Sequence, residues 1–208
     1  MSPKKEFRQE SPYNPLDKKN LGISVADAML ARPIEALPPE QPFLGAGIYA
    51  IYYVGSYAAY QPISRKNQEK KFEAPIYVGK AIPAGARKGG FGLDISPGTV
   101  LFNRLAEHAD TIKQTSNLKI EDFFCRYLVV DDIWIPLGEN LLIEMFSPIW
   151  NRIVDGFGNH DPGAGRYKQQ RSFWDVLHPG RAWANKCQPN KRTEKEILEL
   201  IERFLKRT

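Results

Sequence analysis

The chain has 208 residues, of which 42% are hydrophobic and 25% are charged, and its formal net charge is +5. This length suits one domain with additions, or one domain and a small second one, with a core that needs no disulfide or metal staple. It contains no run of 18 apolar residues and begins with a polar segment, so we expect neither a membrane span nor a signal peptide. Its two cysteines, Cys125 and Cys187, lack zinc-ligand spacing, and we expect a cytoplasmic protein that packs them as free thiols.

In chain order, the first 44 residues predict an arm and one short helix. The polar residues 1–20 read as an arm, Ser24 is a plausible cap for a helix over 25–32, and the prolines of 33–42 predict a connector. This part is therefore expected to lie outside the main domain.

β-branched and aromatic stretches then predict three strands, and helical spacing predicts three more helices. The strands are expected at 45–58, 75–81 and 123–130. The helices are expected at 99–114, capped by Thr99, at 136–146, and at 193–207, where Thr193 and Glu196 form a capping box. Long polar or glycine-rich loops are expected at 61–75, 82–98 and 151–192.

Basic residues are unevenly distributed along the chain. Residues 61–95 hold seven Lys/Arg and three acids, and residues 151–192 hold eight and three, whereas residues 96–150 hold four and eight. Basic flanks can follow nucleic-acid phosphates by releasing counterions, and they can equally be solvated loops. Charge alone leaves both interpretations open.

Five sequence pieces carry the strongest functional signal, and they occur in a fixed order. They are Gly47-Ile48-Tyr49 on the first strand, Tyr77-Val78-Gly79 followed by Lys80 on the second, Arg104 with His108 on one helix face, Glu139 on the next helix, and Asn151 twelve residues later. Each piece alone is weak, because a strand tyrosine or a helical Arg/His pair is usually structural. All five in order are specific.

This order resembles the GIY-YIG nuclease superfamily, whose hallmark is GIY, then YIG, an Arg/His helix and the pattern ExxLIxxxxPxxN. The last element reads ENLLIEMFSPIWN here, a match at every defined position, and YVG stands for YIG. The first two elements lie 28 residues apart, wider than in compact members, and the loop before Arg104 is also long. These insertions leave the motifs whole but prevent any transfer of substrate contacts.

The resemblance implies an α+β fold with a small three-stranded mixed or antiparallel sheet flanked by helices. It implies a catalytic core over 45–151, with 1–44 as an N-terminal arm and 152–208 as a basic loop region with a C-terminal helix. Within the superfamily, the chain resembles most the type II restriction endonucleases that cut CCGCGG, because it lacks the extra modules of repair and homing enzymes. A repair or mobile-element nicking enzyme and a non-catalytic DNA-binding module remain the alternatives.

The chemistry of the residues agrees with a phosphodiesterase. Glu139 offers a hard oxygen ligand for Mg²⁺, for which Mn²⁺ can substitute, and one carboxylate favours one metal per site. Arg104 presents a planar fork to phosphate oxygens, and Tyr77 and Lys80 are expected to assist at the phosphate. Asn151 is expected to hold the site together. His160 and His178 are expected to be ordinary loop histidines.

Tyr49 is the candidate general base or water-orienting group. A phenol with a pKa of about 10 is a poor base unless its surroundings tune it. We expect Arg104, the metal and a hydrogen bond to His108 to lower that pKa.

The expected partner is double-stranded DNA, cut by a homodimer that forms either before or upon DNA binding. One copy of the constellation gives one site per chain, and a two-fold protein axis matches a palindromic duplex. The apolar stripe of the C-terminal helix, formed by Ile197, Ile201, Phe204 and Leu205, either packs on the core of its own chain or contacts a second protomer. The N-terminal arm and the insertions are the other candidate contacts.

Overall fold

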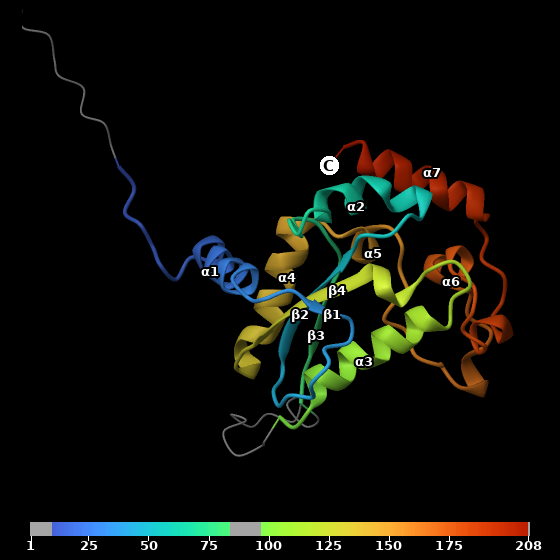
Figure 1. Ribbon diagram of the computed structural model, residues 1–208, viewed down its shortest axis with the longest axis horizontal. Coiled ribbons are helices and arrows are strands. Elements are labelled where there is room, and N and C mark those ends of the chain that lie inside the picture. The colour runs from blue at the N-terminus through green and yellow to red at the C-terminus, as the bar shows by residue number, and fades with distance from the viewer. Residues whose placement is uncertain (1–9, 84–96, 208) are drawn as a thin grey trace, which may run out of the picture.

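The computed structural model describes residues 10–83 and 97–207. Across these residues, four strands form one antiparallel sheet in the order β1-β4-β2-β3 (Figure 1). They are β1 (Glu35–Ala36), β2 (Gly47–Tyr53), β3 (Pro75–Ala81) and β4 (Phe123–Val129). The α+β fold expected from the sequence is confirmed, and the sheet is wholly antiparallel.

The expectation of three strands was one short. Glu35 and Ala36 pair with Cys125 and Phe124, so the segment 33–42 adds a strand where the prolines predicted a plain connector. The strand is two residues long and lies at the sheet edge, where neighbouring prolines are tolerated because they need not donate to a ladder.

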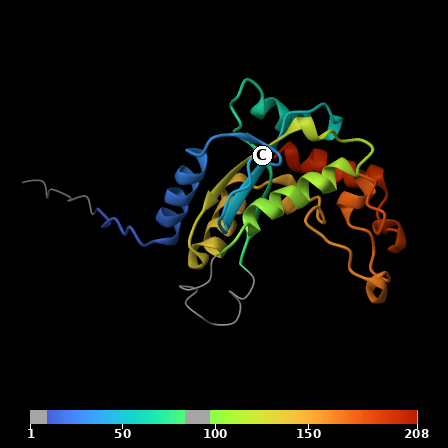
Figure 2. The ribbon, with the colours of Figure 1, turned by 60° about the horizontal axis from the view of Figure 1, so that its bottom comes forward.

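Helices cover both faces of the sheet. α1 (Lys18–Leu30) and α4 (Ile135–Phe146) lie on one face, and α3 (Val100–Lys113) and α5 (Ile149–Arg152) lie on the other (Figures 1 and 2). Alternate residues of β2 serve the two sides, with Ile48 and Ala50 in the cluster under α1 and α4, and Tyr49 and Ile51 in the larger cluster under α3. Tyr49 is thereby directed toward α3.

The first helix begins earlier than expected, at Lys18 rather than residue 25. Asp17 caps it by accepting a hydrogen bond from Lys19 N at 2.8 Å, so Ser24 lies inside the helix and caps nothing. Thr99 does precede α3, but its side chain makes no capping bond. Before α1, residues 10–17 extend away from the rest of the chain (Figures 1 and 2).

The polar excursion between β2 and β3 contains α2 (Gln61–Asn67), which was expected to be a loop. The buried side chain of Asn67 links the two ends of this excursion. Its Nδ2 donates to Tyr53 O and Ala74 O at 3.0 and 2.8 Å, and its Oδ1 accepts from Ala74 N at 2.9 Å. Most of the expected loop 82–98 lies outside the described residues.

Beyond Asn151, the chain continues the same hydrophobic core. Val154, Phe157 and Trp174 belong to the cluster that contains Tyr49, and α6 (Phe173–Leu177) and α7 (Glu194–Leu205) pack beside them. The capping box of α7 is confirmed. Two residues of its apolar stripe, Ile197 and Ile201, are buried in the core of the same chain, and Phe204 and Leu205 pack half-buried against that core.

Candidate active site

Tyr49 and Tyr77 come from neighbouring strands and share one face of the sheet. Tyr49 pairs with Gly79 and Ile51 pairs with Tyr77, which places both tyrosines on the α3 side. A Cβ atom at position 79 would lie 2.4 Å from the Tyr49 hydroxyl oxygen. Position 79 must therefore be glycine, because any side chain there would overlap with the Tyr49 hydroxyl.

The Tyr49 hydroxyl is hydrogen-bonded to His108, which together with Arg104 forms the Arg/His pair on α3. Tyr49 Oη lies 2.6 Å from His108 Nε2, and both side chains are buried. Burial, followed by the charge of Arg104, holds the pKa of His108 well below its usual value. The imidazole is therefore neutral near pH 7 and can accept a proton at Nε2 in the tautomer that carries its hydrogen on Nδ1.

The pKa of Tyr49 differs from the expectation. Burial first, then the neighbouring Tyr77, raises the pKa of Tyr49 well above its usual value, and Arg104 opposes this only in part. Burial also raises the pKa of Tyr77, again against Arg104. The guanidinium acts in the expected direction, but the loss of water around the phenols outweighs it. Tyr49 is a neutral phenol near pH 7.

Arg104 lies one turn before His108 and is held from three sides. Nη1 donates to Glu107 Oε2 at 2.8 Å and lies 2.7 Å from His160 Nε2, and Nη2 donates to Gly158 O at 2.9 Å. This arrangement fixes a planar cation beside the two phenols.

Glu139 and Lys80 form a pair on the α4 side of β3. Lys80 Nζ donates to Glu139 Oε2 at 2.5 Å, and the glutamate side chain is only 16% exposed. The carboxylate is near enough to contribute to the raised pKa values of both Tyr49 and Tyr77. Since β3 is the last strand of the sheet, the predicted residues surround its free edge.

Asn151 contacts the backbone of β3 rather than a reacting group. Its Nδ2 donates to Val78 O and its Oδ1 accepts from Val78 N, both at 2.8 Å. The amide therefore behaves as a short piece of extra strand. It holds α5 against Val78, the middle residue of the Tyr77-Val78-Gly79 motif.

Three residues of the loop after α5 belong to the site and were not predicted. The Phe157 ring stacks on His108 at 4.5 Å and 16°, Gly158 accepts from Arg104, and His160 meets Arg104. A Cβ at Gly158 would lie 3.0 Å from Tyr77 Oη. The glycine-rich GFGNHDPGAGR stretch was the available signal, and His160 is a loop histidine, as expected, that contacts Arg104. His178, by contrast, is buried outside the site against Tyr60 and Asn117.

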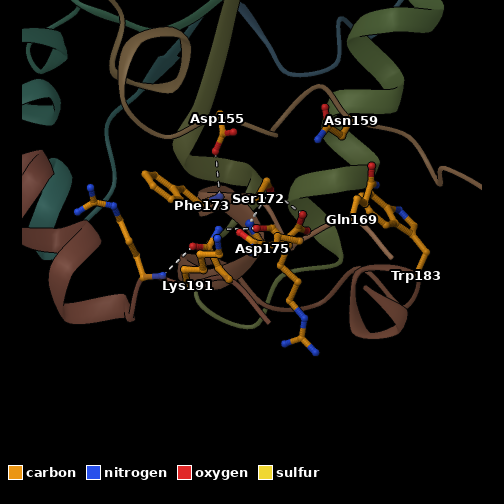
Figure 3. Close-up of a pocket in the computed structure, with 12 residues that line it drawn as sticks. Asp155, Asn159, Gln169, Ser172, Phe173, Asp175, Trp183 and Lys191 are labelled. Atoms are coloured by element: carbon orange, nitrogen blue, oxygen red, sulfur yellow. Dashed lines mark hydrogen bonds between the residues drawn. The ribbon is translucent and has the colours of Figure 1, made fainter. Parts of the chain in front are cut away.

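A polar depression leads away from this loop. A cavity of about 260 Å³ is lined by residues that include Arg104, His108, Gly158, Asn159 and Trp183. A second cavity of about 440 Å³ shares Asn159 and Trp183 and continues past Gln169 and Lys191 (Figure 3). We call the two together the polar groove.

Residues 10–83 and 97–207 contain no helix long and apolar enough to cross a membrane. Comparison with protein families matches residues 41–205 to the Eco29kI GIY-YIG domain. No curated protein matches the chain. The family match covers more than half of the chain and includes all five sequence pieces, so the protein belongs to the Eco29kI GIY-YIG family and is a restriction-type nuclease.

Proposed function

We propose that the protein is a type II restriction endonuclease that hydrolyses phosphodiester bonds in both strands of double-stranded DNA at a palindromic site. The observation that carries the proposal is the 2.6 Å contact between Tyr49 Oη and His108 Nε2, placed beside the Arg104 guanidinium. This arrangement brings together a proton acceptor, His108, the Tyr49 hydroxyl and an oriented cation, Arg104. Cys125 and Cys187 are both free and buried, which supports the cytoplasm as its compartment.

The contact supplies a route for the proton of the attacking water. A water molecule at the Tyr49 hydroxyl gives its proton to Oη as its oxygen attacks phosphorus and the P–O bond to the leaving oxygen breaks, while Oη passes its own proton to His108 Nε2. The phenol then never needs to be a phenolate in the resting enzyme. This accommodates a raised Tyr49 pKa, which would be a handicap for a simple phenolate base.

Arg104 stabilises the charge that develops on the phosphate oxygens. Its guanidinium is already oriented by Glu107, His160 and Gly158, so little reorganisation is needed when DNA binds. The Tyr77 hydroxyl, on the same face, is placed to donate to the phosphate or the water. Lys80 holds the Glu139 carboxylate and adds positive charge at the strand edge.

Glu139 suits a magnesium ion. Mg²⁺ commonly keeps several waters and binds through one or two carboxylates together with substrate phosphates. In the described part of the chain, no group of three or more His, Cys, Asp or Glu side chains is placed to hold a metal, so a single carboxylate with water and DNA is the fitting donor set. When bound, one Mg²⁺ per site, or Mn²⁺ in its place, would supply charge stabilisation to the leaving oxygen.

Digestion of a mapped, supercoiled plasmid with Mg²⁺ tests the proposed function. We expect discrete linear fragments whose sequenced ends share one palindromic site. Nicked circles as the final product would favour a repair or mobile-element enzyme. Binding without cleavage in either Mg²⁺ or Mn²⁺ would favour a non-catalytic module.

The polar groove is the proposed path of the DNA backbone beyond the cut site. Its far wall carries Lys191 and Arg192, both exposed, beside the amides of Gln169 and Gln170. Replacing both Lys191 and Arg192 with Gln should lower DNA affinity and flatten the salt dependence by about 0.9 in log–log slope per lost phosphate contact.

Fluorescence anisotropy across a salt series measures this slope. Lys206→Gln is the matched control, because Lys206 lies at the opposite end of α7 and is ion-paired with Glu202. An unchanged slope in the double variant would show that the backbone runs elsewhere.

We further propose a homodimer on DNA, because one chain carries one site and two strands must be cut. A short duplex with one site should bind two protomers at saturation and yield double-strand breaks, as native mass spectrometry and denaturing gels can establish. Since Ile197 and Ile201 of α7 are buried in their own core, the N-terminal arm and the insertions are the favoured candidate contacts. One protomer per duplex, with nicks alone, would contradict the dimer.

A further inference from the structure

One arginine lies wholly inside the C-terminal part of the chain. The side chains of Arg181 and Asp175 are each 2% exposed, and Arg181 Nε donates to Asp175 Oδ1 at 2.7 Å. The guanidinium lies 4.7 Å from the ring centre of Trp174 and 4.6 Å from that of Trp183. A buried charge persists only when it is paired and fully hydrogen-bonded, so the surroundings must supply further acceptors.

Those acceptors are the backbone carbonyls of one loop. Arg181 Nη2 donates to Gly156 O at 2.9 Å, and Nη1 donates to Asn159 O at 3.0 Å and Phe157 O at 3.3 Å. Three of the four backbone carbonyls of residues 156–159 thus accept hydrogen bonds from the one planar guanidinium of Arg181. A planar guanidinium can hold such a set, whereas a point-like ammonium cannot.

The same loop is in contact with both members of the α3 pair. Phe157 stacks on the His108 ring at 4.5 Å and 16°, and Gly158 O accepts from Arg104 Nη2 at 2.9 Å. His108 is the proposed proton acceptor, and Arg104 is the proposed phosphate ligand. Every link from Arg181 to these two groups is therefore a direct contact.

We propose that Arg181 is a positioning residue for DNA cleavage: by fixing loop 156–159, it sets the ring orientation of His108 and the direction of the Arg104 guanidinium. The assignment rests on the proposed function. It gives the segment beyond Asn151 a part in the chemistry, although none of its residues lies in the five motif pieces.

The competing explanation is that Arg181 only stabilises the fold. Arg181→Lys separates the two, because it keeps the charge beside Asp175 and loses the three-carbonyl fork. If the lysine variant does not fold, the double variant Asp175→Leu/Arg181→Met removes both charges at once and leaves no unpaired ion in the interior.

Histidine NMR of the free protein provides a readout that is independent of cleavage. The chain has three histidines, so their Hε1 signals can be assigned with single His→Gln variants. In the wild-type protein, the His108 signal should be shifted by the stacked Phe157 ring. We expect Arg181→Lys to move it toward the position of an exposed histidine, and Phe157→Leu to do the same.

Single-turnover cleavage at saturating DNA should fall by about 10- to 100-fold in Arg181→Lys while DNA affinity changes little, since a small misplacement of reacting groups is that costly. In the Phe157→Leu background, the same substitution should cost less than it does alone, because the two act through one loop. Met29→Ala is the matched control: Met29 is fully buried on the opposite face of the sheet, so its loss should lower stability without moving His108.

If Arg181→Lys leaves both the His108 signal and the saturated cleavage rate at wild-type values, Arg181 supports stability alone and the proposal is wrong. If the wild-type protein cuts no DNA while the His108 signal still moves in Arg181→Lys, the proposed function fails and the positioning contact stands.

Discussion

Glu139→Ala is expected to abolish DNA cleavage while leaving DNA binding largely intact. The carboxylate lies close enough to the tyrosine edge of β3 to help raise the pKa of Tyr77, and it is the proposed ligand of the magnesium ion. Without it, a bound ion would lack its protein oxygen ligand, and the leaving oxygen would lack the charge stabilisation that the ion would supply. Cleavage of a mapped plasmid in Mg²⁺ and Mn²⁺, together with gel-shift binding, measures the two properties separately.

Glu144→Ala is the matched control on the same helix. Five residues further along α4, Glu144 points about 140° away from Glu139 and is exposed. Its loss should leave cleavage nearly unchanged. An inactive Glu144→Ala with an active Glu139→Ala would mean that the motif has been aligned in the wrong register.

Tyr49→Phe is expected to lose about 10²- to 10⁴-fold in cleavage rate, the usual contribution of a general acid–base group. The ring keeps its place in the core, and only the hydroxyl that contacts His108 Nε2 is removed. Single-turnover kinetics measure the loss. Circular dichroism and thermal melting establish that the variant is folded at the assay temperature.

Tyr52→Phe is the comparison for that experiment. Tyr52 lies on the same strand and is equally buried, but it faces the other side of the sheet, where its hydroxyl accepts from Arg126 Nη1 at 3.1 Å. Both variants lose one buried hydroxyl bond, and only Tyr49→Phe should lose activity. Near-wild-type turnover in Tyr49→Phe would remove Tyr49 from the mechanism.

Sequence patterns predicted the elements that carry the motifs because those elements have strong local signals. The β-branched and aromatic run of β2, the helical spacing around His108 and the capping box of α7 each depend on neighbours within a few residues. The strand β1 escaped prediction because two residues carry no periodicity, and their pairing with Cys125 is a contact across about 90 residues of chain. The helix α2 was hidden by its polar composition.

The site was predicted in part for the same reason. The five motif pieces could be recognised from their order, whereas Phe157 and His160 join the site through tertiary contacts that leave only a glycine-rich stretch in the sequence. The direction of the Tyr49 pKa was also misjudged. The sequence names the charged neighbour, Arg104, but the extent of burial depends on how α3, α5 and the loop close over the phenol.

The amide of Asn151 has a consequence for how the molecule avoids self-association. β3 is the free edge of the sheet, and an exposed edge is a template for strand addition from another chain. Asn151 occupies both hydrogen-bonding groups of Val78, in the middle of that edge, with a side chain that cannot propagate a ladder. A strand from a second sheet therefore finds the hydrogen-bonding groups in the middle of β3 already taken by a side chain of the same molecule.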